Sequence, residues 1–136
     1  MAAIGELIRV EGDGSISFGD YTLGSKSKKE ENVDGATYKV KTFKEITKLE
    51  KNEGFVYEST PGTAVEHLVC NSDGATFSVE GPEDAQITLE FLPETLYDIV
   101  VDGKDAGTMK TNLGGKLSLS VELGDGKAVE VSIKKA

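Results

Sequence analysis

The segment TNLGGKLS, residues 111–118, is the part of this sequence that most resembles a phosphate-binding loop. A P-loop requires G-x-x-x-x-G-K-[ST] between a strand and a helix, because the glycine-rich backbone and the helix N-terminus hold the phosphates. Here Leu117 follows Gly115-Lys116, and Lys110 stands where the first glycine should be. The alternating residues after Lys116 are typical of a strand. The segment therefore predicts a turn in a β-meander over residues 96–123, and no nucleotide site.

His67 and Cys70 are the single histidine and the single cysteine of the chain. They form H-x-x-C, but tetrahedral zinc needs further cysteine or histidine ligands, and a strand points residues three apart to opposite faces. A Ser-His-Asp or Cys-His site would have to use His67, and no G-x-S-x-G motif is present. We therefore expect no zinc site and no catalytic residue, with a structural or surface His67 and a buried Cys70 thiol.

Acidic and aromatic residues leave two kinds of ligand open. The 24 acidic residues allow many carboxylate pairs, so their number does not identify a glycosidase. The acidic turns do not match the EF-hand loop, and calcium stays a minor alternative to an expected absence of cofactors. A glycan needs an aromatic platform, and the chain has no Trp and four Tyr. The candidate ligand-facing aromatics are Tyr21, Tyr38 and Tyr57, although their strand patterns also fit burial.

The elements that must position these residues are strands. Asp-Gly occurs five times, and this dipeptide favours tight turns because Gly tolerates positive φ. Short alternating segments lie between the turns, and roughly a dozen of them predict an all-β fold, an antiparallel β-sandwich or flattened barrel of short strands. The residues predicted to face the core are Val40, Phe77, Val79, Ile87, Leu89, Phe91, Tyr97, Ile99, Val101, Leu117, Leu119, Val121, Val129, Val131 and Ile133.

Two local features allow alternatives. Thr42–Glu45 has a capping-box pattern that allows a short helix at 43–51, but turn residues at 51–54 favour a hairpin. Asp34–Val40 resembles Asp73–Val79, at a spacing of about forty residues that allows two similar units sharing one core.

Length and composition predict one domain over residues 1–136. Within it, residues 1–62 are expected to contribute hairpins and residues 63–136 an Ig-like sandwich region. No apolar run approaches the roughly 20 residues of a membrane-spanning helix. The N-terminus lacks signal-peptide regions, so we expect a cytoplasmic protein if Met1 is the native start.

The net charge of −9 would repel a phosphate backbone, so nucleic acid is not an expected partner. Lys26, Lys28 and Lys29 form the one lysine cluster in the sequence. Because Glu30 and Glu31 follow at once, the cluster predicts a solvated loop.

Over most of its length the chain resembles a family of short bacterial all-β proteins that often carry the name endosialidase. The resemblance lies in Ser15–Tyr21, Tyr38–Phe43, Phe55–Val65 and Met109–Leu123. It implies strands and turns but no catalytic motif. Sialidases hold the substrate carboxylate with three arginines and carry Asp-boxes with a Trp, whereas this chain has only Arg9 and no Trp. We therefore expect the name to be a misassignment.

These observations predict a non-enzymatic structural or protein-interaction module that acts through its sheet surface or edges. A small β domain must cover its exposed edges, so we expect a protein partner or self-association as a homo-oligomer. The alternatives are a carbohydrate-binding module with a glycan partner, or a glycosidase as the family name suggests.

Overall fold

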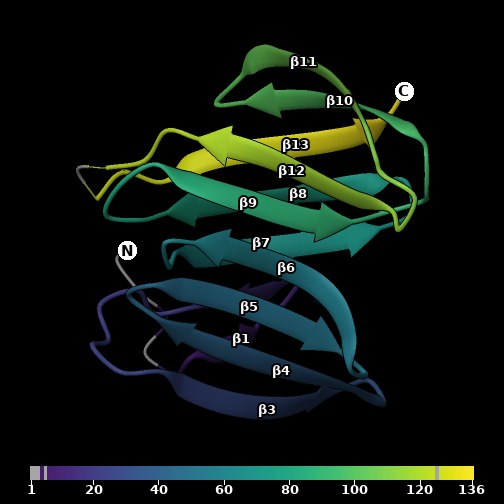
Figure 1. The fold of residues 1–136 in the computed structure, drawn as a ribbon. Helices are drawn as coiled ribbons and strands as arrows, with labels where there is room; N and C mark the ends of the chain where they lie inside the picture. The colour runs from purple at the N-terminus through teal and green to yellow at the C-terminus, as the bar shows by residue number, and fades with distance from the viewer. Residues whose placement is uncertain (1–3, 5, 125) are drawn as a thin grey trace.

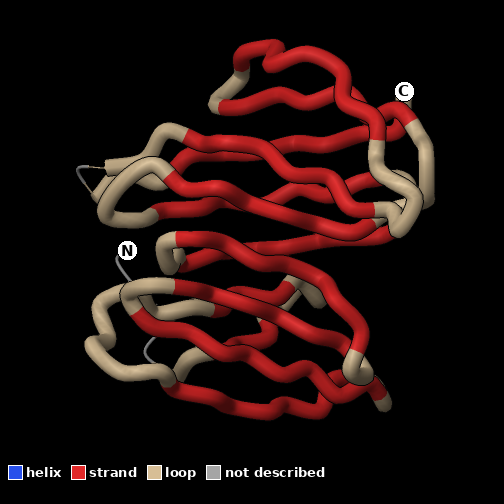
Figure 2. Tube along the Cα trace, in the orientation of Figure 1, coloured by secondary structure: helices blue, strands red, loops and turns tan. Residues whose placement is uncertain are grey.

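A computed structural model describes Ile4 and residues 6–124 and 126–136. Strands β1 to β13 form two antiparallel sheets that pack face to face as a sandwich, which confirms the predicted all-β fold (Figures 1 and 2). Sheet A has seven strands, in the spatial order β1 (Ile8–Val10), β2 (Ile16–Phe18), β7 (Ala64–Asn71), β8 (Gly74–Glu80), β13 (Val129–Lys135), β10 (Leu96–Val101) and β11 (Lys104–Lys110). Sheet B has six, in the order β12 (Lys116–Val121), β9 (Ala85–Glu90), β6 (Gly54–Thr60), β5 (Ile46–Lys51), β4 (Ala36–Phe43) and β3 (Ser27–Val33).

One hydrophobic core lies between the sheets, and its residues run from Ile8 to Ile133. The predicted core residues are buried except Val101 and Val129, which are partly buried and pack against the core. Both sheets take strands from 1–62 and from 63–136, so the two parts do not form separate units. No helix in the described part of the chain has the length and apolar character needed to cross a membrane.

Tight turns join many neighbouring strands. Asp34-Gly35 and Asp102-Gly103 each connect two paired strands with positive φ at both residues, as type I′ turns require. Asn52 and Glu53 do the same between β5 and β6, at φ 49° and 68°. Residues 46–51 are therefore strand β5, which confirms the predicted hairpin and contradicts the alternative of a short helix at 43–51.

The apparent repeat of about forty residues does not extend to the topology. β4 pairs with β5 inside sheet B, whereas the corresponding strands β8 and β9 lie in different sheets. The turns differ as well, because Gly74 pairs with Asn71 and the turn between β7 and β8 consists of Ser72 and Asp73. The two segments share a turn-and-strand pattern and occupy different places in the fold.

Two further predictions need correction. Residues 96–123 do not form one meander, because β10 and β11 form a hairpin in sheet A and β12 crosses to sheet B to pair with β9. Gly115 still serves backbone geometry, since its φ is +84° and a Cβ there would lie 2.2 Å from the carbonyl oxygen of Phe91. The lysine cluster is not a loop, because Lys28 and Lys29 lie in the edge strand β3.

Candidate functional site

The three candidate tyrosines lie in three different environments. Tyr57 is fully buried in the core, so its selection as a ligand-facing residue is wrong. Its hydroxyl lies 2.8 Å from Oγ1 of Thr63, and burial raises its pKa. Tyr21 follows β2, and its hydroxyl donates to Oε2 of Glu80 at 3.2 Å. Tyr38 is half-buried at the opposite end of the sandwich. The fold therefore does not gather these rings into one platform.

Tyr38 lines an apolar groove of about 300 Å³ between the sheets at one end of the sandwich. Phe55, Val56, Phe91 and Leu92 line the same groove. The Nζ of Lys51 lies 5.7 Å from the ring centroid of Tyr38, and that of Lys116 lies 4.6 Å from the ring centroid of Phe55. These ammonium groups occupy ring faces on which a sugar would stack.

Two polar side chains of this groove bear on catalysis. Among its described lining residues Glu90 is the single carboxylate, and it pairs with Lys116 at 3.6 Å. A glycosidase needs two facing carboxylates. Burial raises the pKa of the Cys70 thiol to about 11, so the thiol stays protonated at neutral pH and is a poor nucleophile. Cys70 is half-buried, less than the sequence predicts.

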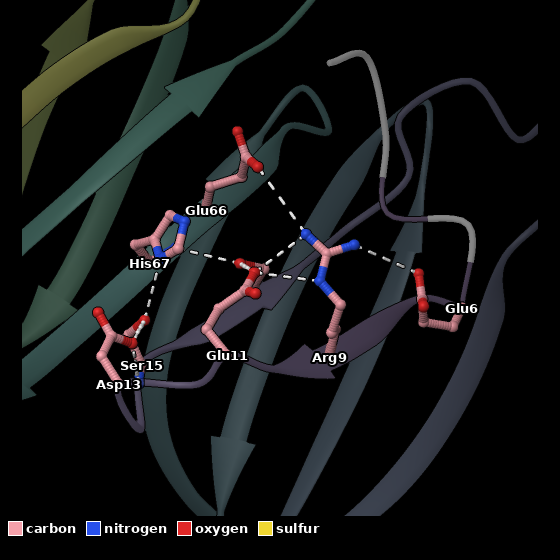
Figure 3. Close-up of polar contacts among 8 residues, drawn as sticks. Glu6, Arg9, Glu11, Asp13, Ser15, Glu66 and His67 are labelled. Carbon is pink, nitrogen blue, oxygen red and sulfur yellow. Dashed lines mark hydrogen bonds and ion pairs between the residues drawn. The ribbon is translucent and has the colours of Figure 1, made fainter.

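Arg9 lies at the centre of a polar cluster on the outer side of β1 and β7 (Figure 3). Its guanidinium reaches carboxylate oxygens of Glu11 at 3.0 Å, Glu6 at 3.6 Å and Glu66 at 3.8 Å. The hydrogen bond to Glu11, followed by the nearby carboxylates, raises the pKa of Arg9. The single arginine is thus engaged with the protein's own carboxylates.

His67, Ser15 and Asp13 meet in the same region, although 52 residues separate Ser15 from His67 (Figure 3). The Oγ of Ser15 donates to Oδ1 of Asp13 at 2.5 Å and lies 3.1 Å from Nδ1 of His67. In a catalytic triad the imidazole stands between the carboxylate and the serine. Here the serine stands in the middle and is only 2% exposed, so the trio is a structural contact.

A β-bulge in β7 creates this contact. His67 has φ 56°, and its N–H donates to Oγ of Ser17 at 3.1 Å. The bulge interrupts the alternation of inward and outward side chains along β7. As a result Val65 is buried, whereas Val69, four residues later, is exposed. No local pattern in the sequence signals this arrangement. The sequence left a structural or a surface role open for His67, and in the structure its side chain is exposed.

Metal binding gains no support from the geometry. In the chain as described, no three or more His, Cys, Asp or Glu side chains gather in a way that could hold a metal ion. The oxygen Oδ1 of Asp13 accepts from the backbone and side chain of Ser15, and Oδ1 of Asp20 does the same with Thr22. These carboxylates stabilise local turns.

The four edge strands differ in how they are protected against pairing with another chain. β1 has only three residues. β3 carries the consecutive charges of residues 28–31, and β11 carries Lys104, Asp105 and Lys110 and has a bulge at its pairing with β10. Short length, charges and bulges are the usual protections of an edge. In β12, by contrast, residues 117–121 are uncharged and regular.

The free edge of β12 presents unpaired backbone groups. Lys116 accepts at its carbonyl from the N–H of Asn112 and donates its own N–H to the Asn112 side chain, so its backbone points away from β9. Alternate residues of an antiparallel strand point to the same side. The N–H and C=O groups of Ser118 and Ser120 therefore also point to the free edge.

A groove of about 370 Å³ lies beside this edge. Ser120, Val121 and Glu122 line one side, and the turn of the β10–β11 hairpin, residues 101–106, contributes to the other. β11 itself is exposed along its length except at Met109, because sheet B has no strand opposite it (Figure 1). We call this region the β12 groove.

Similarity to known proteins adds no guide to function. Comparisons with family models, with curated proteins and with solved structures found no match. The resemblance to the family that carries the name endosialidase therefore stays a prediction.

Proposed function

We propose that this protein is a non-enzymatic interaction module that binds an extended segment of a partner protein along the free edge of β12. The observation that carries the proposal is that residues 117–121 of the edge strand β12 are regular and uncharged, and that this edge opens onto the β12 groove. An added strand would exchange backbone hydrogen bonds with Ser118 and Ser120, which is how β-augmentation gains affinity.

The unequal sheets support the same site. Sheet A has seven strands and sheet B has six. A strand added beside β12 would become the seventh strand of sheet B and would extend that sheet over β10 toward β11, the two strands by which sheet A continues past β12 (Figure 1). Its inward side chains would contact Val101, which lines the β12 groove and which the domain alone leaves only partly buried. The gain is the burial of apolar surface, at about 25 cal/mol per Å².

A second copy of the chain is a less suitable donor at this edge. Antiparallel pairing of two β12 strands would relate the copies by a two-fold axis perpendicular to sheet B. Both A sheets would then lie on the same side, and each continues past β12 with β10 and β11 (Figure 1). The two β11 strands would compete for one space. Self-association, if it occurs, would use another surface, and light scattering at micromolar concentration tests it.

The carbohydrate-binding and glycosidase alternatives stay weaker proposals. The lysines over Tyr38 and Phe55 count against sugar stacking. In the apolar groove that Tyr38 lines, Glu90 is the single carboxylate among the described lining residues, which counts against acid–base catalysis. Binding in a glycan array, or turnover of a glycoside, would revive them.

Selection of extended peptides from a random displayed library tests the proposed function. We expect selected peptides with alternating apolar residues, and we expect them to slow amide hydrogen exchange at Ser118 and Ser120. Ser118→Pro should abolish binding, because proline removes the N–H and is tolerated at an edge. Ser118→Ala keeps the N–H and should bind as the wild type. Equal binding by Ser118→Pro, or no protection of the two amides, would refute strand addition at β12.

A further inference from the structure

Three lysines lie side by side on the outer face of sheet B, at the edge far from β12. Lys28 pairs in register with Lys41, and Lys41 pairs with Lys48. The neighbours of Lys41 along its strand, Val40 and Thr42, are buried, so the lysines point outward. Adjacent strands are about 4.8 Å apart, and like charges directly opposite one another destabilise a sheet.

Lys26 and Lys39 extend this row, and we call the five residues the lysine face: Lys26, Lys28, Lys39, Lys41 and Lys48. Within the described residues the ion pairs closer than 4.0 Å involve Arg9 or Lys116, and none involves the lysine face. Lys41 has a lowered pKa because of desolvation and then because of the four neighbouring lysines. The ammonium groups of Lys28, Lys41 and Lys48 therefore repel one another, and within the described residues no ion pair closer than 4.0 Å offsets this repulsion, in a chain whose net charge is −9.

We infer that the lysine face docks a short acidic segment of a partner protein. Three like charges in register across neighbouring strands conflict with sheet stability, and such conflicts are expected at functional surfaces. The row spans three strands, a distance of about 10 Å. Carboxylates about 5 to 6 Å apart, as at positions i and i+4 of a helix, match the spacing of the lysines. The inference is independent of the proposed function, because β3 and β12 are opposite edges of sheet B.

The surroundings favour an acidic protein segment over a nucleic acid. Lys39 pairs in register with Glu30 on one side and Glu50 on the other, and Lys48 pairs with Glu58 of β6. These carboxylates limit the area of positive charge. A long polyanion would meet these groups and the net negative charge of the domain. Bases also need an aromatic platform, and the ring of Phe43 beside this face carries Lys26 at 5.9 Å from its centroid.

The experiment measures binding of a fluorescent polyglutamate peptide by anisotropy. The K28Q/K41Q/K48Q variant should bind about tenfold more weakly, as three exposed charge contacts imply. The K104Q/K110Q/K134Q variant is the matched control, because it loses the same charge from exposed lysines of sheet A, and it should bind nearly as the wild type. Added salt should weaken wild-type binding. Amide spectra confirm that each variant folds, and K41Q alone replaces the triple variant if the latter does not fold.

Three results would overturn the inference. The first is an absence of polyglutamate binding by the wild type. The second is an equal loss of affinity in both triple variants, which would indicate a response to net charge alone. The third is binding of oligothymidine more tightly than polyglutamate, which would identify a nucleic-acid surface.

Discussion

Phe18 and Tyr57 meet edge to face across the two sheets, with ring centroids 5.2 Å apart and ring planes at 79°. Phe18 lies in β2 of sheet A and Tyr57 in β6 of sheet B. Phe77 of β8 also meets Tyr57 edge to face, at 5.9 Å between centroids. Tyr57 therefore joins both sheets through its ring, and its hydroxyl ends in the polar group of Ser59 and Thr63.

Tyr57→Phe should lower the free energy of unfolding by about 1 kcal/mol, because it removes one hydrogen bond while Ser59 and Thr63 keep theirs to each other. Tyr57→Ala should cost about 3 to 5 kcal/mol, because it also leaves a cavity. Urea unfolding measures both. Equal losses in the two variants would mean that the hydroxyl, and not the ring, holds the sheets together.

Glu53→Gly should stabilise the protein by about 1 kcal/mol. Glu53 is exposed and has φ 68° in a two-residue turn after Asn52, where Asn-Gly is the preferred pair. Thermal unfolding measures the gain. The reciprocal control is Gly35→Glu in the matching turn of β3 and β4, which should destabilise the protein. A loss of stability in Glu53→Gly would show that the Glu53 side chain makes a stabilising contact.

Glu80→Gln should raise the free energy of unfolding at neutral pH by about 1 to 3 kcal/mol. Glu80 is 1% exposed, its Oε1 has no hydrogen-bond partner in the described structure, and Oε2 accepts from Tyr21. Glutamine keeps an acceptor for Tyr21 and removes the buried charge. Glu83→Gln is the exposed control and should change little. A less stable Glu80→Gln variant would indicate a cation or donor bound at the carboxylate.

Glu11 should make stability depend on acidic pH. The hydrogen bond from Ser17, and then that from Arg9, lowers the pKa of Glu11 from its ordinary 4.5. A lowered folded-state pKa stabilises the fold above 4.5, and this contribution disappears as pH falls through the lower folded value.

Glu11→Gln should therefore be less stable than the wild type at neutral pH and equally stable at about pH 2. Urea unfolding at a series of pH values measures the difference. Ser17→Ala should show the same trend to a smaller extent, because Arg9 remains. A constant difference between Glu11→Gln and the wild type at every pH would exclude the carboxylate as its source.

Local patterns in the sequence determined the strands and their buried faces. Leu117, Leu119 and Val121 alternate with polar residues, and they are buried because successive side chains of a strand point to opposite faces. Asp34-Gly35 and Asp102-Gly103 determined their turns in the same way, since the turn geometry depends on the two residues alone.

Only the tertiary structure decided which strands became neighbours. The crossing of β12 to sheet B leaves its edge open, and no pattern within residues 116–121 records that crossing. The same holds for Ser15 beside His67 and for the in-register lysines 28, 41 and 48, which come from three separate segments. Alternation decides which face of a strand is apolar, whereas pairing depends on the free energy of the whole assembled core. The candidate surfaces of this protein arise from pairing, and so they appear only in the folded chain.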